Sequence, residues 1–435
     1  MRELHNIYDC PCGREHVSNL ELVTGNGVIR RVPELLEKHG IKKPYIVADK
    51  NTYAAAAKEL AEILTDAGVP YVLYVFDKDV IKPEEESVGS IVLHFDLSCD
   101  GVIGVGSGVI NDCCKVFSAC GHYTYISIAT APSVDGYASY SSSMDVDGLK
   151  STVPSKVPDV IVGDVDILKN APIDMLKSGL GDMVAKYIGL LEWKLSHIIN
   201  DEYFCQYIYD MMQEALETCV NNAPGLLARD DGAVKTVFEG LVLAGMGMTY
   251  AQNTRPASGG EHYFSHIWDM RGLEYGTTTG MHGTQASIGT ILSAGLYEEL
   301  IKIRPDREKA LAYAASFDKE AWFKKLTALV GKGAKSMIRN EEVDGKYDLE
   351  KHAKRLDIIL EKWDELRKVI EELPKKEEMI ALMRSVEAPV HPTEIGIESD
   401  LGEVFMATKD VKDKYVLARL AWDLGVIDEL AETLK

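Results

Sequence analysis

The chain has 435 residues, of which 46% are hydrophobic and 26% charged, a length that suits two domains better than one small core. Its formal charge of −21 (47 basic minus 68 acidic residues) argues against nucleic acid or an anionic membrane as a partner. No hydrophobic run approaches the length of a membrane span, and the polar opening MRELHNIYDCPCG is not typical of a signal peptide. We therefore expect a soluble, cytoplasmic protein.

The eight cysteines are scattered and often lie in apolar or helical context, as reduced thiols do in a reducing compartment. Disulfides are not expected. Cys10-Pro11-Cys12 with His16 resembles a metal knuckle, but no second pair follows at zinc-finger spacing. We predict a turn with buried thiols there.

Short apolar strands alternate with helices over the first 164 residues. Strands are predicted at 20–24, 45–48, 69–76, 101–105, 123–129 and 157–162, and helices at 28–39, 52–67 and 84–97. This alternation is typical of a parallel sheet wrapped by helices, so the first part of the chain is predicted to be α/β.

A glycine-rich turn, GVGSGVINDCCK at 104–115, stands between a predicted strand and a helix. Such turns let the backbone approach a pyrophosphate, which the helix N-terminus attracts, although a tight structural turn is the plain alternative. Asp49 ends an earlier strand and precedes the glycines by 55 residues (104 minus 49), whereas the common dinucleotide fingerprint places its acid afterwards. We predict a different nucleotide fold, with the first sheet segments on the adenosine and a later loop on the phosphates.

The candidate cofactor-binding residues follow from this interpretation. Asp49 could accept hydrogen bonds from the ribose hydroxyls and would repel a 2′-phosphate, which favours NAD over NADP without excluding NADP. A second polar cluster, TAPSVDGYAS at 130–139, also follows a strand, and Asp135 in it is either a functional carboxylate or a turn cap. The full set is Asp49, Gly106, Ser107, Gly108, Asp112, Thr130, Ser133 and Ser139.

Beyond residue 164 the chain keeps a helical period, and we place the domain boundary there, with an α/β NAD-binding domain at 1–164 and a helical metal- and substrate-binding domain at 165–435. Helices are predicted at 203–223, 232–252, 285–303, 308–330 and 349–373.

The stretch 255–285 holds His262, His266 and His282, and the first two are four residues apart and so share a helix face. Neutral imidazoles at such spacing commonly hold a transition metal, and Asp182 in GLGDMVAK is the best candidate for a third ligand. One carboxylate and two imidazoles leave a coordination position open, as a catalytic site requires, and suit zinc or nickel. The alternative is that these histidines only satisfy hydrogen bonds in a helical core.

Five motifs in order, GVGSGVINDCCK, TAPSVDGYAS, GLGDMVAK, RPASGGEHYFSH and MHGTQ, resemble the sn-glycerol-1-phosphate dehydrogenase family. This family lies within the superfamily of glycerol dehydrogenase, iron-type alcohol dehydrogenases and dehydroquinate synthase, and the resemblance runs from roughly Leu20 to Leu424. It implies a dehydroquinate synthase-like fold, with an α/β nucleotide-binding domain and an all-α domain, and a homodimer or larger assembly. It also implies that Asp182, His262 and His282 hold the metal, and that Lys186 stands where iron-type relatives have a fourth ligand.

The resemblance implies an enzyme that interconverts dihydroxyacetone phosphate and sn-glycerol 1-phosphate with NAD or NADP. Asp135, His266 and Lys186 are then the candidate catalytic residues, with His266 as a proton relay or substrate contact. Lys186 is the first choice for charge beside the substrate phosphate, against a structural salt bridge, and the amides at 258–260 are the second choice.

Three other functions are weighed against this one. Plain glycerol oxidation is the closest competitor, because the scaffold is shared. A dehydroquinate synthase-like cyclase is less favoured, because relatives of that kind generally carry glutamate where this chain has Asp182. A catalytically silent metal- or nucleotide-binding protein is the third.

Overall fold

The computed structural model describes residues 6–78, 80–147 and 149–434. The chain forms two compact units. The first, called here the α/β unit, comprises Met1–Met183 and Asp210–Asn253, and the second, the helical unit, comprises Val184–Tyr209 and Thr254–Lys435. The last strand of the sheet ends at Asp164, where the sequence places a domain boundary, and that boundary stays a prediction.

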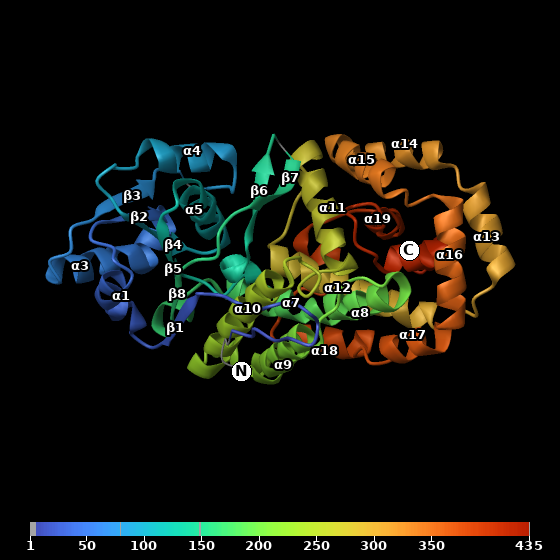
Figure 1. Ribbon diagram of the computed structural model, residues 1–435, viewed down its shortest axis with the longest axis horizontal. Helices are drawn as coiled ribbons and strands as arrows, with labels where there is room; N and C mark the ends of the chain where they lie inside the picture. The colour runs from blue at the N-terminus through green and yellow to red at the C-terminus, as the bar shows by residue number, and fades with distance from the viewer. Residues whose placement is uncertain (1–5, 79, 148, 435) are drawn as a thin grey trace. The chain divides into compact units, whose positions relative to one another are not determined.

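The α/β unit is built on a six-stranded parallel sheet with the strand order β1-β8-β5-β4-β2-β3 (Figure 1). All neighbouring strands run parallel, which confirms the predicted α/β class. The strands are β1 (Glu21–Gly25), β2 (Pro44–Asp49), β3 (Val72–Phe76), β4 (Gly101–Gly106), β5 (Thr124–Ala129) and β8 (Val160–Asp164).

Helices cover both faces of this sheet, so its central strands are apolar on both sides. On one face, Ile46 and Ile103 pack with side chains of α1 (Val32–Lys38) and α3 (Lys58–Asp66). On the other face, the neighbouring residues Val47 and Val102 pack with α4 (Glu85–Leu93) and α5 (Gly108–Gly121). Successive strand residues point to opposite faces, which explains why every residue of β4 is buried.

The sheet changes its winding direction beside β2. The chain passes from β2 to β3 on one side and then to β4 on the other. Val47 pairs with Gly104, and Gly106 pairs with Ala129, so β2, β4 and β5 end at the same edge. Ligands of open α/β sheets bind at such a point, beyond the carboxyl ends of the strands.

A short antiparallel hairpin, β6 (Ser141–Val146) and β7 (Leu149–Pro154), follows the loop after β5. This hairpin was not predicted from the sequence. Asp147 has a φ of 52°, and Asp-Gly is the dipeptide that two-residue hairpin turns favour, so the signal was present in the sequence.

The remaining elements of the α/β unit are helical. They are η1 (Val28–Arg31), α2 (Lys50–Thr52), η2 (Tyr53–Ala57), η3 (Asp135–Ala138), α6 (Val165–Leu168), α7 (Ile173–Val184), α9 (Gln206–Asn222), η4 (Ala223–Gly225) and α10 (Asp231–Ala251). By the division above, the last residue of α7 and the first turn of α9 are counted with the helical unit.

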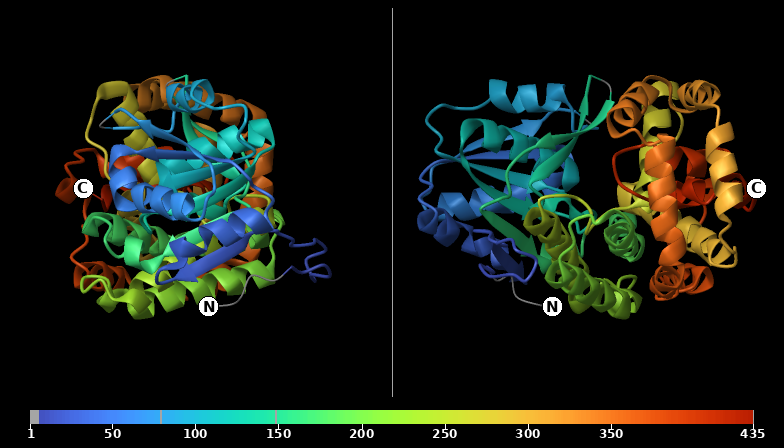
Figure 2. Two further views of the ribbon diagram at one scale, coloured as in Figure 1. Left: turned by 90° about the vertical axis from the view of Figure 1, so that its left-hand side faces the viewer. Right: turned by 45° about the vertical axis from the view of Figure 1, so that its right-hand side comes forward.

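The described part of the helical unit consists of helices and loops (Figures 1 and 2). Its helices are α8 (Lys186–Asn200), α11 (Gly260–Tyr275), α12 (His282–Leu300), α13 (Arg307–Ser316), α14 (Lys319–Val330), η5 (Gly331–Gly333), α15 (Ala334–Asp344), α16 (Leu349–Glu361), α17 (Trp363–Ile370), α18 (Lys376–Ser385), η6 (Pro392–Ile395), α19 (Leu401–Thr408), α20 (Leu417–Asp423) and α21 (Ile427–Glu432). This confirms the predicted helical second half.

Two of the long predicted helices are each divided in two. The helix predicted at 308–330 breaks after Ser316, because Asp318 turns out of the helix and its carboxylate caps α14 by accepting from Ala321 N–H. The helix predicted at 349–373 divides at Lys362, between α16 and α17. Among the residues that the structure describes, no helix is long and apolar enough to cross a membrane.

Candidate functional site

The glycine turn after β4 lies at the edge of the sheet, and neighbouring side chains pack closely against its glycines. A Cβ on Gly106 would lie 2.6 Å from Ile110, and one on Gly108 would lie 3.1 Å from Val134. Only glycine lets the first turn of α5 pack this closely. Ser107, the N-cap of α5, lies at this edge, where the amides of the helix N-terminus attract an anion.

The loop after β5 lies beside this turn. Ser107 Oγ and Ser133 Oγ are 2.5 Å apart, and the Thr130 N–H donates to the Gly106 carbonyl at 3.2 Å. The two polar segments that the sequence singles out, 104–115 and 130–139, are therefore in contact.

Lys115 holds the second half of that loop, a role that the sequence analysis missed. Its ammonium is fully buried and donates to Gly136 O at 3.0 Å, Ser139 Oγ at 2.9 Å and Ser141 O at 2.6 Å. Burial lowers the pKa of Lys115, and the nearby Asp112 charge opposes that shift. Ser139, predicted to bind cofactor, is thus 4% exposed and part of this internal network.

Asp112 is engaged with the same network. One carboxylate oxygen lies 3.6 Å from Lys115 Nζ, and the other accepts from the Ser143 N–H at 3.3 Å. Burial raises the pKa of Asp112, and the Lys115 charge opposes that rise. The contacts of Asp112 are therefore with a buried cation and the start of the hairpin.

Asp49 has a structural task at the end of β2. Its Oδ1 accepts from the Thr52 N–H at 2.7 Å, while Thr52 Oγ1 accepts from the Asp49 N–H at 2.9 Å. This reciprocal pair is a capping box for the short helix α2. Asp49 lies at the end of the strand next to β4, so the capped carboxylate stands at the predicted nucleotide edge.

Asp182 is fully buried on α7 and is tied to the loop after β5. Its Oδ2 accepts from the backbone N–H of Asp135 at 2.9 Å, and the Ser178 hydroxyl donates to the Ser133 carbonyl at 3.2 Å. A Cβ on Gly179 would lie 1.8 Å from the carbonyl oxygen of Pro132. The two acids that the sequence selects, Asp135 and Asp182, are therefore neighbours.

The three histidines of the helical unit lie on two adjoining helices. His262 and His266 are on α11, and His282 is the first residue of α12. The ring centroids of His262 and His282 are 5.1 Å apart, and those of His266 and His282 are 6.5 Å apart. One donor atom of His262 and one of His282 lie within 4.8 Å of each other, which suits two ligands of one ion.

Glu261 orients His262, although the sequence analysis assigned it no role. Glu261 Oε1 accepts from His262 Nδ1 at 2.7 Å and from the Gly259 N–H at 2.8 Å. Because a carboxylate only accepts, Nδ1 carries the hydrogen and Nε2 keeps its lone pair for a ligand. The sequence places Glu261 directly before His262, which was the available signal.

A second buried acid, Glu192 of α8, meets the start of α11. Its carboxylate accepts from the Gly260 N–H at 2.7 Å, the Leu417 N–H at 2.8 Å and the Tyr297 hydroxyl at 3.2 Å. Burial, and then the nearby Glu261 charge, raise the pKa of Glu192 to about 7. Nothing in the sequence pattern had singled out Glu192.

The backbone amides at 258–260, which were the second choice for binding the substrate phosphate, are already occupied by protein partners. The amides of Gly259 and Gly260 donate to two carboxylates, and Ser258 is held through its carbonyl and hydroxyl by Lys414. A phosphate there would displace these partners and face two acids. Lys186, the first choice, is the fully buried first residue of α8.

Comparison with known proteins places the chain in a family. A model described as iron-containing alcohol dehydrogenase matches residues 23–172. Glycerol-1-phosphate dehydrogenase [NAD(P)+] of Halalkalibacterium halodurans is 34% identical over 295 residues, which are 67% of this chain and 74% of the relative. The chain belongs to the glycerol-1-phosphate dehydrogenase family. It is therefore an NAD(P)-dependent oxidoreductase that acts on a secondary alcohol.

Two further relatives carry the same name. The Geobacillus stearothermophilus protein of the same name is 26% identical over 91% of this chain and 90% of its own length. The Pyrococcus furiosus protein is 31% identical over 64% of this chain and 78% of its own.

The fold is shared with solved structures of lower identity. Glycerol dehydrogenase from Schizosaccharomyces pombe matches with a TM-score of 0.61 at 16% identity, covering 95% of this chain and 90% of the other. A Ralstonia eutropha protein that is described by similarity as an alcohol dehydrogenase matches with a TM-score of 0.62 at 15% identity and covers 96% of both chains. These likenesses confirm the predicted dehydroquinate synthase-like fold.

Proposed function

We propose that the protein interconverts dihydroxyacetone phosphate and sn-glycerol 1-phosphate. In the reducing direction, the ketone, NADH and one proton give the secondary alcohol and NAD+. The observation that carries the proposal is the pair His262 and His282, with the His262 ring oriented by Glu261, in a chain of this family.

The residues fit a divalent metal. Asp182, His262 and His282 offer one carboxylate and two imidazole donors, a set that suits zinc or nickel and leaves a position for substrate oxygen. Asp182 Oδ2 and His262 Nδ1 are each engaged by a neighbour, which fixes the orientation of the other donor atom. When bound, the cation polarises the substrate oxygen while the nicotinamide exchanges hydride with the adjoining carbon.

The nucleotide end of the site lies at the carboxyl edge of the sheet. Gly106, Ser107 and Gly108 offer a close backbone and a helix N-terminus to the pyrophosphate, while Thr130 and Ser133 line the adjoining loop. Asp49 accepts from the adenosine ribose and disfavours a 2′-phosphate, so NAD is the preferred cofactor and NADP the weaker one. Asp112 and Ser139 act by holding this loop, through Lys115.

Proton transfer and substrate binding fall to three further side chains. His266 lies one helical turn after His262, with its ring 6.5 Å from that of His282, and we assign it the proton that the alkoxide takes up. Asp135 is held beside Asp182 and completes the polar surroundings of the substrate. Lys186 supplies the charge for the phosphate, because a buried ammonium is stabilised by an anion.

One assay tests the proposal against its closest alternative, glycerol dehydrogenase. Metal content is measured first, and NADH oxidation is then followed with dihydroxyacetone phosphate, with dihydroxyacetone and with no substrate. We expect kcat/KM to be highest with the phosphorylated ketone and to fall for Lys186→Met with that ketone only. A preference for dihydroxyacetone would establish the alternative, and no turnover by metal-replete protein would exclude both.

We also propose that the enzyme is a cytoplasmic homodimer or larger homo-oligomer without a nucleic-acid partner. Family membership supports the assembly, and the charge of −21 opposes binding to polyanions. Light scattering of the purified protein gives the mass directly, and a monomer at micromolar concentration would contradict the first part.

A further inference from the structure

The segment before β1 is folded into a tight loop. Ile7 and His16 exchange two backbone hydrogen bonds, of 2.9 and 2.7 Å, which close the loop at its base. Inside it the Gly13 N–H donates to the Cys10 carbonyl at 2.9 Å, and Gly13 has a φ of +80°, so the chain turns there. The predicted turn is thus present, and it brings donor atoms of Cys10, Cys12 and His16 within 4.8 Å of one another.

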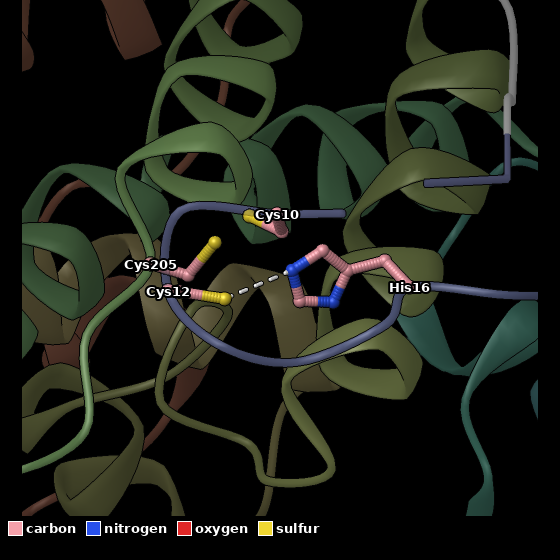
Figure 3. Close-up of side chains that lie close together, drawn as sticks. All are labelled: Cys10, Cys12, His16 and Cys205. Atoms are coloured by element: carbon pink, nitrogen blue, oxygen red, sulfur yellow. Dashed lines mark hydrogen bonds between the residues drawn. The ribbon is translucent and has the colours of Figure 1, made fainter. Parts of the chain in front are cut away.

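The loop is anchored on the end of α10 in a way that selects one nitrogen of His16. His16 Nδ1 lies 3.2 Å from the Tyr250 carbonyl, and Arg14 donates to the Ala251 carbonyl at 3.3 Å. A carbonyl only accepts, so Nδ1 carries the hydrogen and the lone pair is on Nε2. That nitrogen points at Cys12 Sγ, 3.3 Å away (Figure 3).

A third sulfur comes from a distant part of the sequence. Cys205 directly precedes α9, which begins at Gln206. Figure 3 draws Cys205 together with the three donors of the loop. His16 and Cys205 are 0% exposed and Cys10 is 8% exposed.

We propose that Cys10 Sγ, Cys12 Sγ, His16 Nε2 and Cys205 Sγ bind a structural Zn2+ ion, distinct from the metal of the proposed active site. Three thiolates and one imidazole form a complete tetrahedral set of the kind that structural zinc prefers, with no position left for substrate. The Tyr250 carbonyl on Nδ1 is the outer partner that such a histidine ligand uses. Binding replaces three thiol protons, which are released to solvent.

The site has a structural consequence for the chain. It links the loop at 7–16, whose Arg14 and His16 also contact two carbonyls of α10, to the residue that directly precedes α9. The sequence alone favours a turn over a metal site here, because no second cysteine pair follows at zinc-finger spacing. The fold supplies the missing ligand from residue 205, and one cysteine suffices because His16 provides the fourth donor.

The proposal is tested by measuring bound zinc in a variant that lacks two ligands of the proposed active-site metal. The full-length His262→Ala/His282→Ala variant is loaded with Zn2+, freed of excess ion and analysed for zinc per chain. We expect one tightly bound ion, lost when Cys12→Ser and Cys205→Ser are added and kept when Cys120→Ser, an exposed cysteine outside the cluster, is added instead. No zinc in the starting background, or zinc that survives both cysteine changes, would overturn the site.

A second measurement leaves all cysteines in place, in case the serine variants do not fold. The same His262→Ala/His282→Ala protein is loaded with Co2+ and its spectrum recorded. Thiolate-to-cobalt charge transfer in the near ultraviolet, with the intense visible bands of tetrahedral cobalt, is the expected result. Absence of these bands means that the four side chains form only a hydrogen-bonded thiol cluster, and the proposal fails.

Discussion

Two of the three candidate metal ligands, His262 and Asp182, are held by neighbours that leave a second donor atom for an ion. His262 gives its Nδ1 hydrogen to Glu261, and Asp182 accepts the Asp135 amide. Each of these partners is close in sequence or lies on an adjoining loop, so the orientation of these two ligands is set before any ion binds. This preorganisation lowers the cost of assembling the site.

The first prediction distinguishes the three proposed metal ligands from His266, which is not proposed to bind the metal. Alanine in place of Asp182, His262 or His282 leaves two protein donors, and we expect bound catalytic metal and activity to fall together by at least about 10-fold. His266→Ala should keep the metal and slow turnover. Metal content and steady-state rates are measured for the four variants. All four also carry Cys205→Ser, so that zinc at the proposed structural site does not add to the metal count. Loss of metal from His266→Ala with retention in His262→Ala would reverse the two assignments.

A second prediction concerns the choice between NAD and NADP. Asp49→Ser keeps an oxygen that can cap α2, so the helix start is preserved while the negative charge is removed. We expect the ratio of kcat/KM for NADPH to that for NADH to rise by about 10-fold, because like-charge repulsion of about 1 kcal/mol or more disappears. Thr52→Ala, which breaks the other half of the capping box, is the control and should leave the ratio unchanged. An unaltered ratio in Asp49→Ser would remove Asp49 from the nucleotide site.

At the scale of elements, α7 and the loop after β5 are in contact through a position where only glycine fits. A Cβ at Gly179 would lie 1.8 Å from the Pro132 carbonyl, which is backbone and cannot turn aside. That contact sets the distance between Asp182 and the Asp135 amide. The geometry of one functional side chain therefore depends on the packing of a whole helix.

The third prediction follows from this contact. Gly179→Ala should destabilise the protein by about 1–3 kcal/mol through overpacking, and should reduce metal affinity because α7 must move. Gly89→Ala on α4 is the matched control, since a Cβ there meets nothing within 4 Å, and it should stabilise by about 0.5–1 kcal/mol. Urea unfolding and metal titration of both variants provide the test. Equal stability of the two would show that α7 yields without cost.

Much of this element structure could be predicted from local patterns. Runs such as Tyr45–Ala48 and Gly101–Val105 are apolar at every position, which indicates strands buried on both faces, and both are strands of the sheet. Helix breaks at Asp318 and Lys362 were missed because apolar periodicity continues across them. At these two positions a carboxylate cap or a local turn ends the helix although the apolar periodicity goes on.

The candidate site was predicted in part, for a physical reason. Residues with distinctive chemistry, such as His262 and Asp182, stand out in any sequence. Lys115, Glu192 and Cys205 act through contacts with segments distant in sequence or through burial, and neither is visible in a spacing pattern. The sequence likewise does not single out Gly179, because its role depends on the contact with the Pro132 carbonyl.

At the scale of the whole molecule, the acidic chain confines some of its charge inside. Lys409 and Asp410 form a buried pair at 3.1 Å, and Arg355 binds the buried Asp423 at 2.9 Å. Glu192 differs, because burial and the charge of the neighbouring acid Glu261 together raise its pKa to about 7. Its protonation is therefore linked to the folding equilibrium at pH values above the ordinary pKa of a glutamate.

The last prediction is the sign of that linkage. In the unfolded chain Glu192 loses its proton near its ordinary pKa of 4.5, whereas in the folded chain it keeps the proton up to about pH 7. Between these values the folded state binds more protons, so the Glu192 contribution to stability is fully present below the lower value and is lost as the pH rises. Glu192→Gln is neutral throughout, and any cost of its amide hydrogen bonds is the same at every pH. The free energy of unfolding of wild type minus that of the variant should therefore decrease from about pH 4.5 to about pH 7 and level off above. Urea midpoints across this range measure it, with exposed Glu308→Gln as the control, whose difference from wild type should not change in the same direction. A difference for Glu192→Gln that is constant, or that increases with pH, would show that the buried carboxyl is ionised in the folded protein.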